Sequence, residues 1–304
     1  MKLKNILIIL IISTLLFTNL ISVINAEPLL NNNIISEENF DEKIELMMKF
    51  AHMPSLSTAI IENNSIVWYK GYGYYDIKNQ KTPTEDTIYM AASITKTITS
   101  VAVMQLYEQG LLDIDEDINN YLDFSLRNPK YPDEKITIRN LLSHSSSLNK
   151  FNILTLFITQ KTFGSKYSKQ WWLREHFVPG GTFYRNTIWS KKMPNETYIY
   201  SNMGYNVLEV LVEIASGKNF EEYCRENIFE PLCMFNTSFY LDITKEEDYI
   251  IPYIWQGIYV ALPHYDLAMK AAGGSRTTVE DLSHFLIQPI DLLSKVTLHL
   301  RILK

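Results

Sequence analysis

A strand-to-helix junction at residues 87–110 decides the fold, and its sequence is TIYMAASITKTITSVAVMQLYEQG. The residues before Ser93 are strand-like, and those after it are apolar at helical spacing as far as Gly110, which favours a helix end. Residues three apart share a helix face, so the Lys96 ammonium can reach the Ser93 hydroxyl and help to make it a nucleophile. The junction therefore predicts the core of an acyl-transfer site.

Ser93 has a simpler interpretation as the N-cap of the helix, because serine is a common N-cap residue. The same spacing of serine and lysine also occurs at Ser147 and Lys150. Ser147 ends a turn-like cluster, and no apolar helical face begins at it. The context favours the first pair for chemistry, and the N-cap interpretation stays open.

A second motif, Tyr200-Ser-Asn202, precedes a predicted helix over Asn202 to Ser216, whose apolar positions are Val207, Leu208, Val210, Leu211 and Ile214. Beside Ser93, Tyr200 would pass a proton between nucleophile and leaving group, with its phenol pKa lowered by the nearby ammonium. The Asn202 amide would orient a substrate amide. A similar triplet, Tyr184-Arg-Asn186, lies in a turn-rich stretch, so we prefer the copy at 200–202; either alone is compatible with a packed tyrosine and a surface amide.

The chain has 304 residues, of which 46% are hydrophobic and 20% charged, as in a globular protein of one large domain or two lobes. Residues 1–26 carry Lys2 and Lys4 before a long uncharged stretch, which predicts a signal peptide and a secreted or extracytoplasmic protein. If uncut, residues 5–24 are just long enough to anchor the chain in a membrane.

Removing the leader takes two of the 28 basic residues and none of the 34 acidic ones, so the net charge changes from −6 to −8. No basic stripe is present, and we expect no nucleic-acid partner. The histidines lack zinc-ligand spacing, so we expect no metal and no cofactor. An oxidising compartment would permit a disulfide between Cys224 and Cys233 if their geometry allowed it.

Several further elements are expected along the chain. Helices are predicted at 40–50 and 220–229, a short helical piece at 137–142, and a β-hairpin at 58–69. The helical region at 168–176 contains Trp171 and Trp172, which would belong either to the core or to a pocket.

Seven short motifs follow one another: GYGYYD at 71–76, ASITK at 92–96, GLLDID at 110–115, LLSHSSSL at 141–148, YSNMGY at 200–205, IFEPLCM at 228–234 and AGGSRTT at 272–278. In order and spacing they resemble the serine β-lactamase-related family, which groups class C β-lactamases, D-alanyl-D-alanine carboxypeptidases and related esterases. The resemblance covers residues 38–286 and leaves 287–304 as a divergent tail.

The resemblance implies an α+β fold of the β-lactamase/transpeptidase type, with an antiparallel sheet flanked by helices, a mainly helical lobe at about 112–235 and the site between the lobes. It implies that Ser93 is the acylated nucleophile and Lys96 its proton partner. By the same match, Tyr200 is a second acid/base and Asn202 a contact for the substrate amide.

The sequence departs from the family pattern after Gly274. Relatives carry Lys-Thr-Gly or His-x-Gly on a later strand that completes the oxyanion hole, whereas none of the 30 residues after Gly274 is glycine. Losing one oxyanion donor costs roughly 3–4 kcal/mol, and without later strands the hairpin at 58–69 would have exposed edges and an uncovered apolar face. We therefore expect a truncated product, a damaged gene or a fragmentary sequence. Smaller departures are Ser147 and Cys233, where relatives often have glycine.

Two functional hypotheses follow. The first is an exported serine hydrolase acylated on Ser93 by a small-molecule or peptide substrate, such as a β-lactam, a peptidoglycan peptide or another ester or amide. The second is a catalytically impaired or inactive homologue that acts as a ligand-binding module. An acyl adduct on Ser93 would distinguish them.

Overall fold

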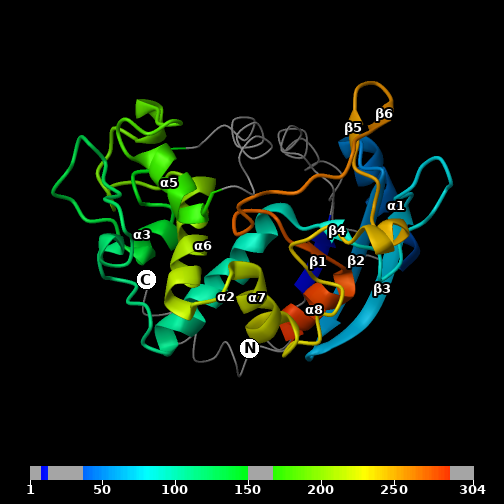
Figure 1. Cartoon of the computed structure of the whole chain (residues 1–304). Helices are drawn as coiled ribbons and strands as arrows, with labels where there is room; N and C mark the ends of the chain where they lie inside the picture. Colours follow the sequence, from blue (N-terminus) through cyan, green and yellow to red (C-terminus); the bar gives the residue numbers. More distant parts are fainter. Residues whose placement is uncertain (1–7, 13–36, 150–166, 288–304) are drawn as a thin grey trace, which may run out of the picture. The chain divides into compact units, whose positions relative to one another are not determined.

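The computed structural model describes residues 8–12, 37–149 and 167–287, which form two compact units (Figure 1). The first unit contains the described residues 8–12, 37–91, 232–265 and 276–287. The second contains 92–149, 167–231 and 266–275. Antiparallel strands and helices are both present, so the expected α+β class is confirmed.

The main sheet of the first unit has three antiparallel strands, β1 (Ile8–Ile12), β2 (Ser55–Glu62) and β3 (Ser65–Gly73), with β2 in the middle. The predicted hairpin at 58–69 is the central part of β2 and β3. Its turn is made by Asn63 and Asn64, whose φ angles of 50° and 60° are tolerated better by asparagine than by most residues.

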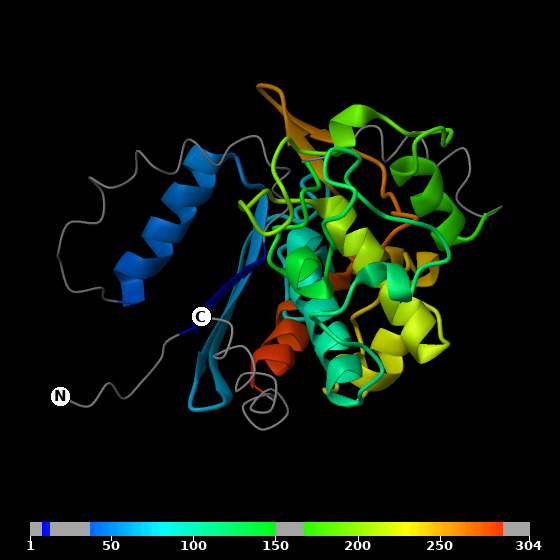
Figure 2. The same ribbon diagram turned by 90° about the vertical axis from the view of Figure 1, so that its left-hand side faces the viewer.

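Both faces of β2 are covered, which explains why its buried residues do not alternate along the strand. Helix α1 (Glu37–Ala51), predicted at 40–50, packs through Met48 against Leu56 and Tyr72. Helix α8 (Val279–Ile287) lies on the other side of the sheet (Figure 2). The expectation of an uncovered apolar face is therefore wrong for β2, whereas Ile66 and Val67 of β3 are exposed.

The expectation of exposed edges is also wrong for β2, because β1 pairs with its outer edge from Ile8 opposite Ile61 to Ile12 opposite Ser57. These residues come from the expected leader, and their apolar β-branched sequence suits a strand. The rest of residues 1–26 lies outside the described part of the chain. In that described part, no helix has the length and apolar character needed to cross a bilayer.

Two short antiparallel pairs complete the first unit. Within the strand-like segment before Ser93, Tyr89–Met90 forms strand β4, which pairs with β7 (Arg276–Thr277). β5 (Tyr253–Trp255) pairs with β6 (Tyr259–Ala261), after a 3-10 helix at Ile243–Asp248.

The second unit is built around helix α6 (Asn202–Ser216), which packs against α2 (Thr95–Glu108), α3 (Ile138–Leu142), α5 (Lys169–Phe177) and α7 (Phe220–Cys224) (Figure 1). Every residue of α6 from Met203 to Val212 is buried. Such all-round burial is typical of a helix in the middle of a core. Single 3-10 turns occur at Ala92–Ile94, Ile118–Asn120 and Asn186–Ile188.

The predicted bounds of α6 are confirmed by its caps. Ser201 is the N-cap and its hydroxyl accepts a hydrogen bond from the Gly204 amide at 3.3 Å, while Gly217, with a φ of 69°, ends the helix. The predicted apolar face is wrong at one position, because Ile214 is 39% exposed. Glu209, which was not assigned to that face, is fully buried instead.

Two other helix predictions need adjustment. The helix expected at 220–229 is α7 only as far as Cys224, and a π-helical turn at Arg225–Phe229 follows it. In α5, Trp172 is buried in the core, whereas Trp171 is partly exposed and stacks on Tyr167. The two cysteines are both free thiols, so the disulfide that the sequence permitted is not formed.

Candidate active site

Ser93 lies in the 3-10 turn that leads into α2, directly after Ala92. The φ of Ala92 is 46°, a left-handed conformation that is strained for a residue with a side chain. The N-cap of α2 is Ile94, which provides no side-chain cap. The N-cap interpretation of Ser93 is therefore wrong, and its hydroxyl makes other contacts.

The Ser93 hydroxyl lies between a lysine and a tyrosine. The Lys96 Nζ donates a hydrogen bond to the Ser93 Oγ at 3.2 Å, and the Tyr200 hydroxyl lies 2.8 Å from the same oxygen. Lys96 comes from the first turn of α2, and Tyr200 directly precedes the N-cap of α6. The structure thus brings together three of the four predicted site residues.

Lys96 is only 6% exposed. Its Nζ also donates a hydrogen bond to the Ala272 carbonyl and lies 5.0 and 5.5 Å from the ring centres of Tyr200 and Tyr205. Burial lowers the pKa of Lys96 to about 7. A large fraction of this amine is therefore neutral near pH 7 and able to accept a proton.

The pKa of Tyr200 is raised, because burial opposes the phenolate more than the hydrogen bond from Ser93 favours it. The expectation that the neighbouring ammonium would lower this pKa is wrong. Burial dominates at Tyr200, and the same burial removes much of the positive charge from Lys96. Tyr200 is therefore a neutral phenol that can donate a proton.

His144 holds the segment that carries Tyr200, a role that sequence reasoning missed. Its Nδ1 accepts a hydrogen bond from the Ser201 amide at 3.1 Å, and its carbonyl accepts one from the Ile199 amide at 2.7 Å. Its ring packs 4.5 Å from that of Tyr200. Burial and the charge of Lys96 lower the pKa of His144 to about 4, so it stays a neutral acceptor. Its place in the 141–148 motif was the available signal.

The segment 271–275 lines α2 beside Lys96. The Thr99 hydroxyl donates to the Ala271 carbonyl at 2.8 Å, and the hydroxyls of Thr95 and Ser275 are 2.8 Å apart. These contacts explain why threonines at 95 and 99 are completely buried in α2. The family motif at 272–278 marked this segment, but the sequence alone gave it no role at the site.

Asn202 is the first residue of α6. Its side-chain oxygen is buried and has no hydrogen-bond partner among the described residues. The structure records no hydrogen bond between Asn202 and Ser93, Lys96 or Tyr200 in the part of the chain that it describes.

The competing motifs lie in different surroundings. The buried Ser147 hydroxyl accepts a hydrogen bond from the Asn128 side chain at 2.7 Å and donates one to the Lys192 carbonyl at 2.5 Å, so it is structural. Its φ of 67° explains why glycine suits this position. Lys150 lies outside the described residues. Tyr184 belongs to a turn, where its amide donates to the Gly181 carbonyl.

No group of histidine, cysteine, aspartate and glutamate side chains that could hold a metal ion occurs within residues 8–12, 37–149 and 167–287.

Comparison with solved structures finds the same fold in proteins of related architecture. The octameric penicillin-binding protein homologue from Pyrococcus abyssi superimposes with a TM-score of 0.71 and 28% identity, covering 85% of this chain and 57% of that one. A class C β-lactamase in complex with cefoxitin gives a TM-score of 0.64 at 19% identity, covering 81% and 63%. The expected β-lactamase/transpeptidase-like fold is confirmed.

Sequence relatives agree. Protein flp of Staphylococcus aureus strain N315 is 27% identical over 264 residues, which cover 83% of this chain and 48% of flp. Beta-lactamase-like protein 2 of Dictyostelium discoideum is 28% identical over 262 residues, covering 81% and 44%. The chain thus spans about half the length of these curated relatives.

A sequence model of the beta-lactamase family matches residues 40–302, which runs past Leu286, the last residue of the resemblance described above. Seven ordered motifs, the shared fold and this match agree, and the chain belongs to the beta-lactamase family.

Proposed function

We propose that the protein is a serine hydrolase that is acylated on Ser93 by an amide or ester substrate. The observation that carries this proposal is the pair of contacts at the Ser93 hydroxyl, with the Lys96 amine at 3.2 Å and the Tyr200 phenol at 2.8 Å. A nucleophilic hydroxyl needs both a base for its proton and an acid for the leaving group, and the opposite pKa shifts of Lys96 and Tyr200 suit these two roles.

In the acylation step, the neutral Lys96 amine accepts the proton of Ser93 while the Ser93 oxygen attacks the substrate carbonyl carbon. A carbon–oxygen bond forms, and the carbonyl electron pair moves onto the oxyanion, which the Ser93 amide stabilises. When the tetrahedral intermediate collapses, the bond to the leaving nitrogen or oxygen breaks. Tyr200 donates a proton to the leaving group and regains one from Lys96.

Deacylation reverses these roles. A water molecule attacks the acyl carbon and gives its proton to the same basic pair, and Ser93 leaves as a hydroxyl. In this scheme the free side-chain oxygen of Asn202 accepts a hydrogen bond from the substrate amide. β-Lactams, peptidoglycan peptides and other esters or peptides contain the required carbonyl, and the scheme does not choose among them.

The test is covalent labelling with a fluorophosphonate probe and with a fluorescent penicillin, followed by peptide mapping. Label on the peptide that contains Ser93 is expected, and Ser93→Ala should remove it. Ser147→Gly is the matched control, because it removes the other serine of the same spacing at a position whose φ suits glycine. An unlabelled but folded wild-type protein would exclude the proposal.

The alternative function is a ligand-binding module without turnover. It predicts saturable binding of a cell-wall peptide or β-lactam without mass increase at Ser93. Intact-protein mass spectrometry after incubation with the ligand distinguishes the two functions, because only acylation survives denaturation.

Export is part of the same proposal. Residues 1–26 have the charge and hydropathy pattern of a signal peptide, and residues 5–24 would anchor the chain if uncut. Either outcome would take β1 away from the edge of β2. N-terminal sequencing of the protein purified from its host tests cleavage after Ala26, and an intact Met1 would support the anchored form.

A further inference from the structure

Glu209 is a completely buried carboxylate in the middle of α6, the most enclosed helix of the second unit. Burying a charged group is costly, and replacing a buried ion pair by apolar side chains is often neutral or stabilising. Stability of the core therefore does not explain why a glutamate lies between Leu208 and Val210. The contacts of its two carboxylate oxygens indicate another role.

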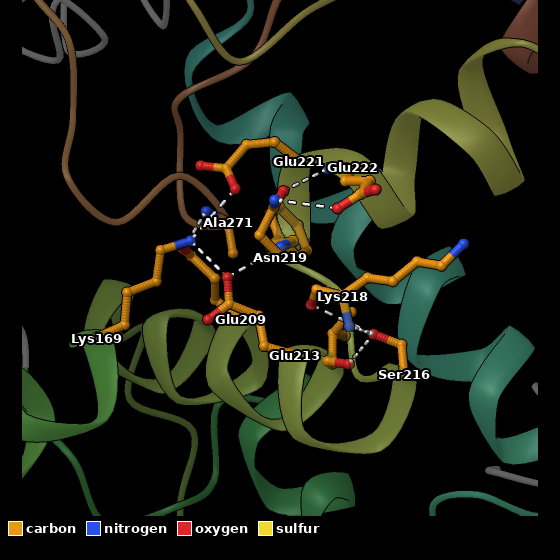
Figure 3. A network of polar contacts seen from close by, with 11 residues as sticks. Lys169, Glu209, Glu213, Ser216, Lys218, Asn219, Glu221, Glu222 and Ala271 are labelled. Carbon is orange, nitrogen blue, oxygen red and sulfur yellow. Dashed lines mark hydrogen bonds and ion pairs between the residues drawn. The ribbon is translucent and has the colours of Figure 1, made fainter.

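One oxygen of Glu209 belongs to an ion-pair cluster (Figure 3). The Lys169 Nζ lies 2.6 Å from the Oε1 of Glu209, 2.7 Å from the Oε1 of Glu213 and 3.4 Å from the Oε2 of Glu221. Lys169 thus has two other carboxylates and does not need Glu209 for its neutralisation. Three carboxylates around one ammonium leave excess negative charge, and burial raises the pKa of Glu209 against the pull of Lys169.

The other oxygen of Glu209 distinguishes it from Glu213 and Glu221. Its Oε2 accepts a hydrogen bond from the Ala271 amide at 2.8 Å, a contact that Figure 3 also shows. The Ala271 carbonyl accepts from Thr99, and the carbonyl of the next residue, Ala272, accepts from the Lys96 Nζ. One buried carboxylate is therefore linked to the proposed base through a single dipeptide.

Each polar group of the dipeptide that takes part in these contacts has a hydrogen-bond partner: the Ala271 amide, the Ala271 carbonyl and the Ala272 carbonyl. Ala271 is fully buried and Ala272 nearly so, which means that water cannot substitute for a lost partner without opening the segment. If the Ala271 amide were released, the Ala272 carbonyl would lose its anchor. Lys96 would then lose both an acceptor and part of the wall that excludes water.

We propose that Glu209 is a positioning residue for Lys96: it holds the 271–272 peptide against α2, and thereby keeps the Lys96 amine dry and beside Ser93. The inference rests on the proposed function, since it gives Lys96 the role of base. Glu209 itself does not touch Ser93 or Tyr200 in the described structure, so it acts through the peptide alone.

The test compares three variants of the full chain. Glu209→Ala removes the acceptor of the Ala271 amide. Glu209→Gln keeps an oxygen that can accept from this amide but removes the charge. Glu213→Gln is the matched control, because Glu213 contacts Lys169 at a similar distance and accepts a hydrogen bond from the Phe220 amide, not from Ala271.

The first readout is the rate of fluorophosphonate labelling of Ser93 from pH 5 to 9. For Glu209→Ala, we expect the rate to fall roughly tenfold to a hundredfold, as for a catalytic group displaced by about 1 Å, and its pH midpoint to rise as Lys96 becomes hydrated. Glu209→Gln should restore the wild-type midpoint. Glu213→Gln should lower the melting temperature without moving the pH midpoint of labelling. If Glu209 had a merely structural role, Glu209→Ala would likewise lower the melting temperature and leave this midpoint unchanged.

The second readout does not need catalysis. Carbon-13 labelling of the lysine side chains, with the Lys96 signal identified by its loss in Lys96→Arg, reports the titration of Lys96 directly. If the probe does not label wild-type protein, the proposed function fails. The positioning role still stands if Lys96 titrates as a buried amine in wild-type protein and its titration shifts in Glu209→Ala. An unchanged Lys96 titration in folded Glu209→Ala overturns the positioning role. Should Glu209→Ala not fold, Glu209→Asp, which keeps the charge but is shorter, must shift the titration in the same direction.

Discussion

Lys96 and Lys169 occupy equivalent places in the second unit but have opposite chemistry. Each lies in the first turn of a helix, where the helix dipole disfavours a cation, and each is largely withdrawn from water. Burial by itself disfavours the charged form of both ammonium groups. At Lys169 the three surrounding glutamates outweigh burial and raise the pKa above its usual range, whereas at Lys96 burial acts alone.

The difference teaches that the neighbours of a buried lysine, more than its depth, decide its role. A lysine surrounded by carboxylates is a permanent cation that joins helices. A lysine surrounded by a carbonyl, a hydroxyl and aromatic rings is an amine that can exchange its proton. Four experiments can break or sharpen this contrast.

The largest expected effect is on the rate of acylation. In Lys96→Arg, a guanidinium that is always charged cannot accept the Ser93 proton, and the rate of labelling should fall roughly 10²–10⁴-fold. The control is Lys169→Arg, which keeps the cation among its glutamates and should label at close to the wild-type rate. Equal labelling of both variants would refute the assignment of Lys96 as the base.

The second effect is on stability. Lys169→Met leaves the carboxylates of Glu209, Glu213 and Glu221 without their cation. Removing one partner of a buried ion pair costs about 3–5 kcal/mol, and urea unfolding at pH 7 measures this loss. A loss below about 1 kcal/mol, the level of an exposed pair, would mean that water screens the cluster.

Lys96→Met should change stability in the opposite direction. Lys96 has no carboxylate partner among the described residues, so the variant removes the cost of burying an amine, offset by the unpaired Ala272 carbonyl. We expect a gain of about 1–3 kcal/mol at pH 7. The same urea experiment applies, and destabilisation comparable to that of Lys169→Met would show that the two lysines are energetically alike.

The smallest expected effect is the pH dependence of labelling. Since burial lowers the pKa of Lys96 to about 7, the neutral base is scarce at pH 6 and predominant at pH 8. The labelling rate should rise roughly tenfold between these values and then level off. A rate that is constant from pH 6 to 8, or that rises only above pH 9, would contradict a depressed Lys96 pKa.

Much of the architecture around the site could be predicted from local patterns. The bounds of α6 follow from Ser201 as a capping residue and from Gly217 as a terminator, and both signals lie next to the helix in the sequence. The proximity of Ser93 and Lys96 follows from helix periodicity. That Tyr200 joins them required the resemblance to a family, because no local rule brings residue 200 to residue 93.

The rest depends on burial, which a single sequence does not reveal. The direction of the Tyr200 pKa was wrong because the sequence showed a nearby ammonium but not the loss of solvent. The burial of Glu209 could not be predicted, because a glutamate within an apolar helix normally lies on the solvent side. Only the enclosure of α6 from all directions places it inside. The pairing of β1 with β2 was missed because the apolar run of residues 8–12 also fits a leader.

The buried Lys96 also makes folding a proton-releasing reaction. In the unfolded chain its pKa is near 10.5, and in the folded protein it is about 7. Between pH 7 and pH 10.5 the unfolded state binds one more proton at this residue than the folded state does. The burial of Lys96 therefore destabilises the folded state fully below pH 7, and this cost falls as the pH rises towards 10.5. At pH 8.5, refolding should therefore release close to one proton from Lys96, and the heat of refolding should depend on the ionisation enthalpy of the buffer. In Lys96→Met that part of the buffer dependence should disappear.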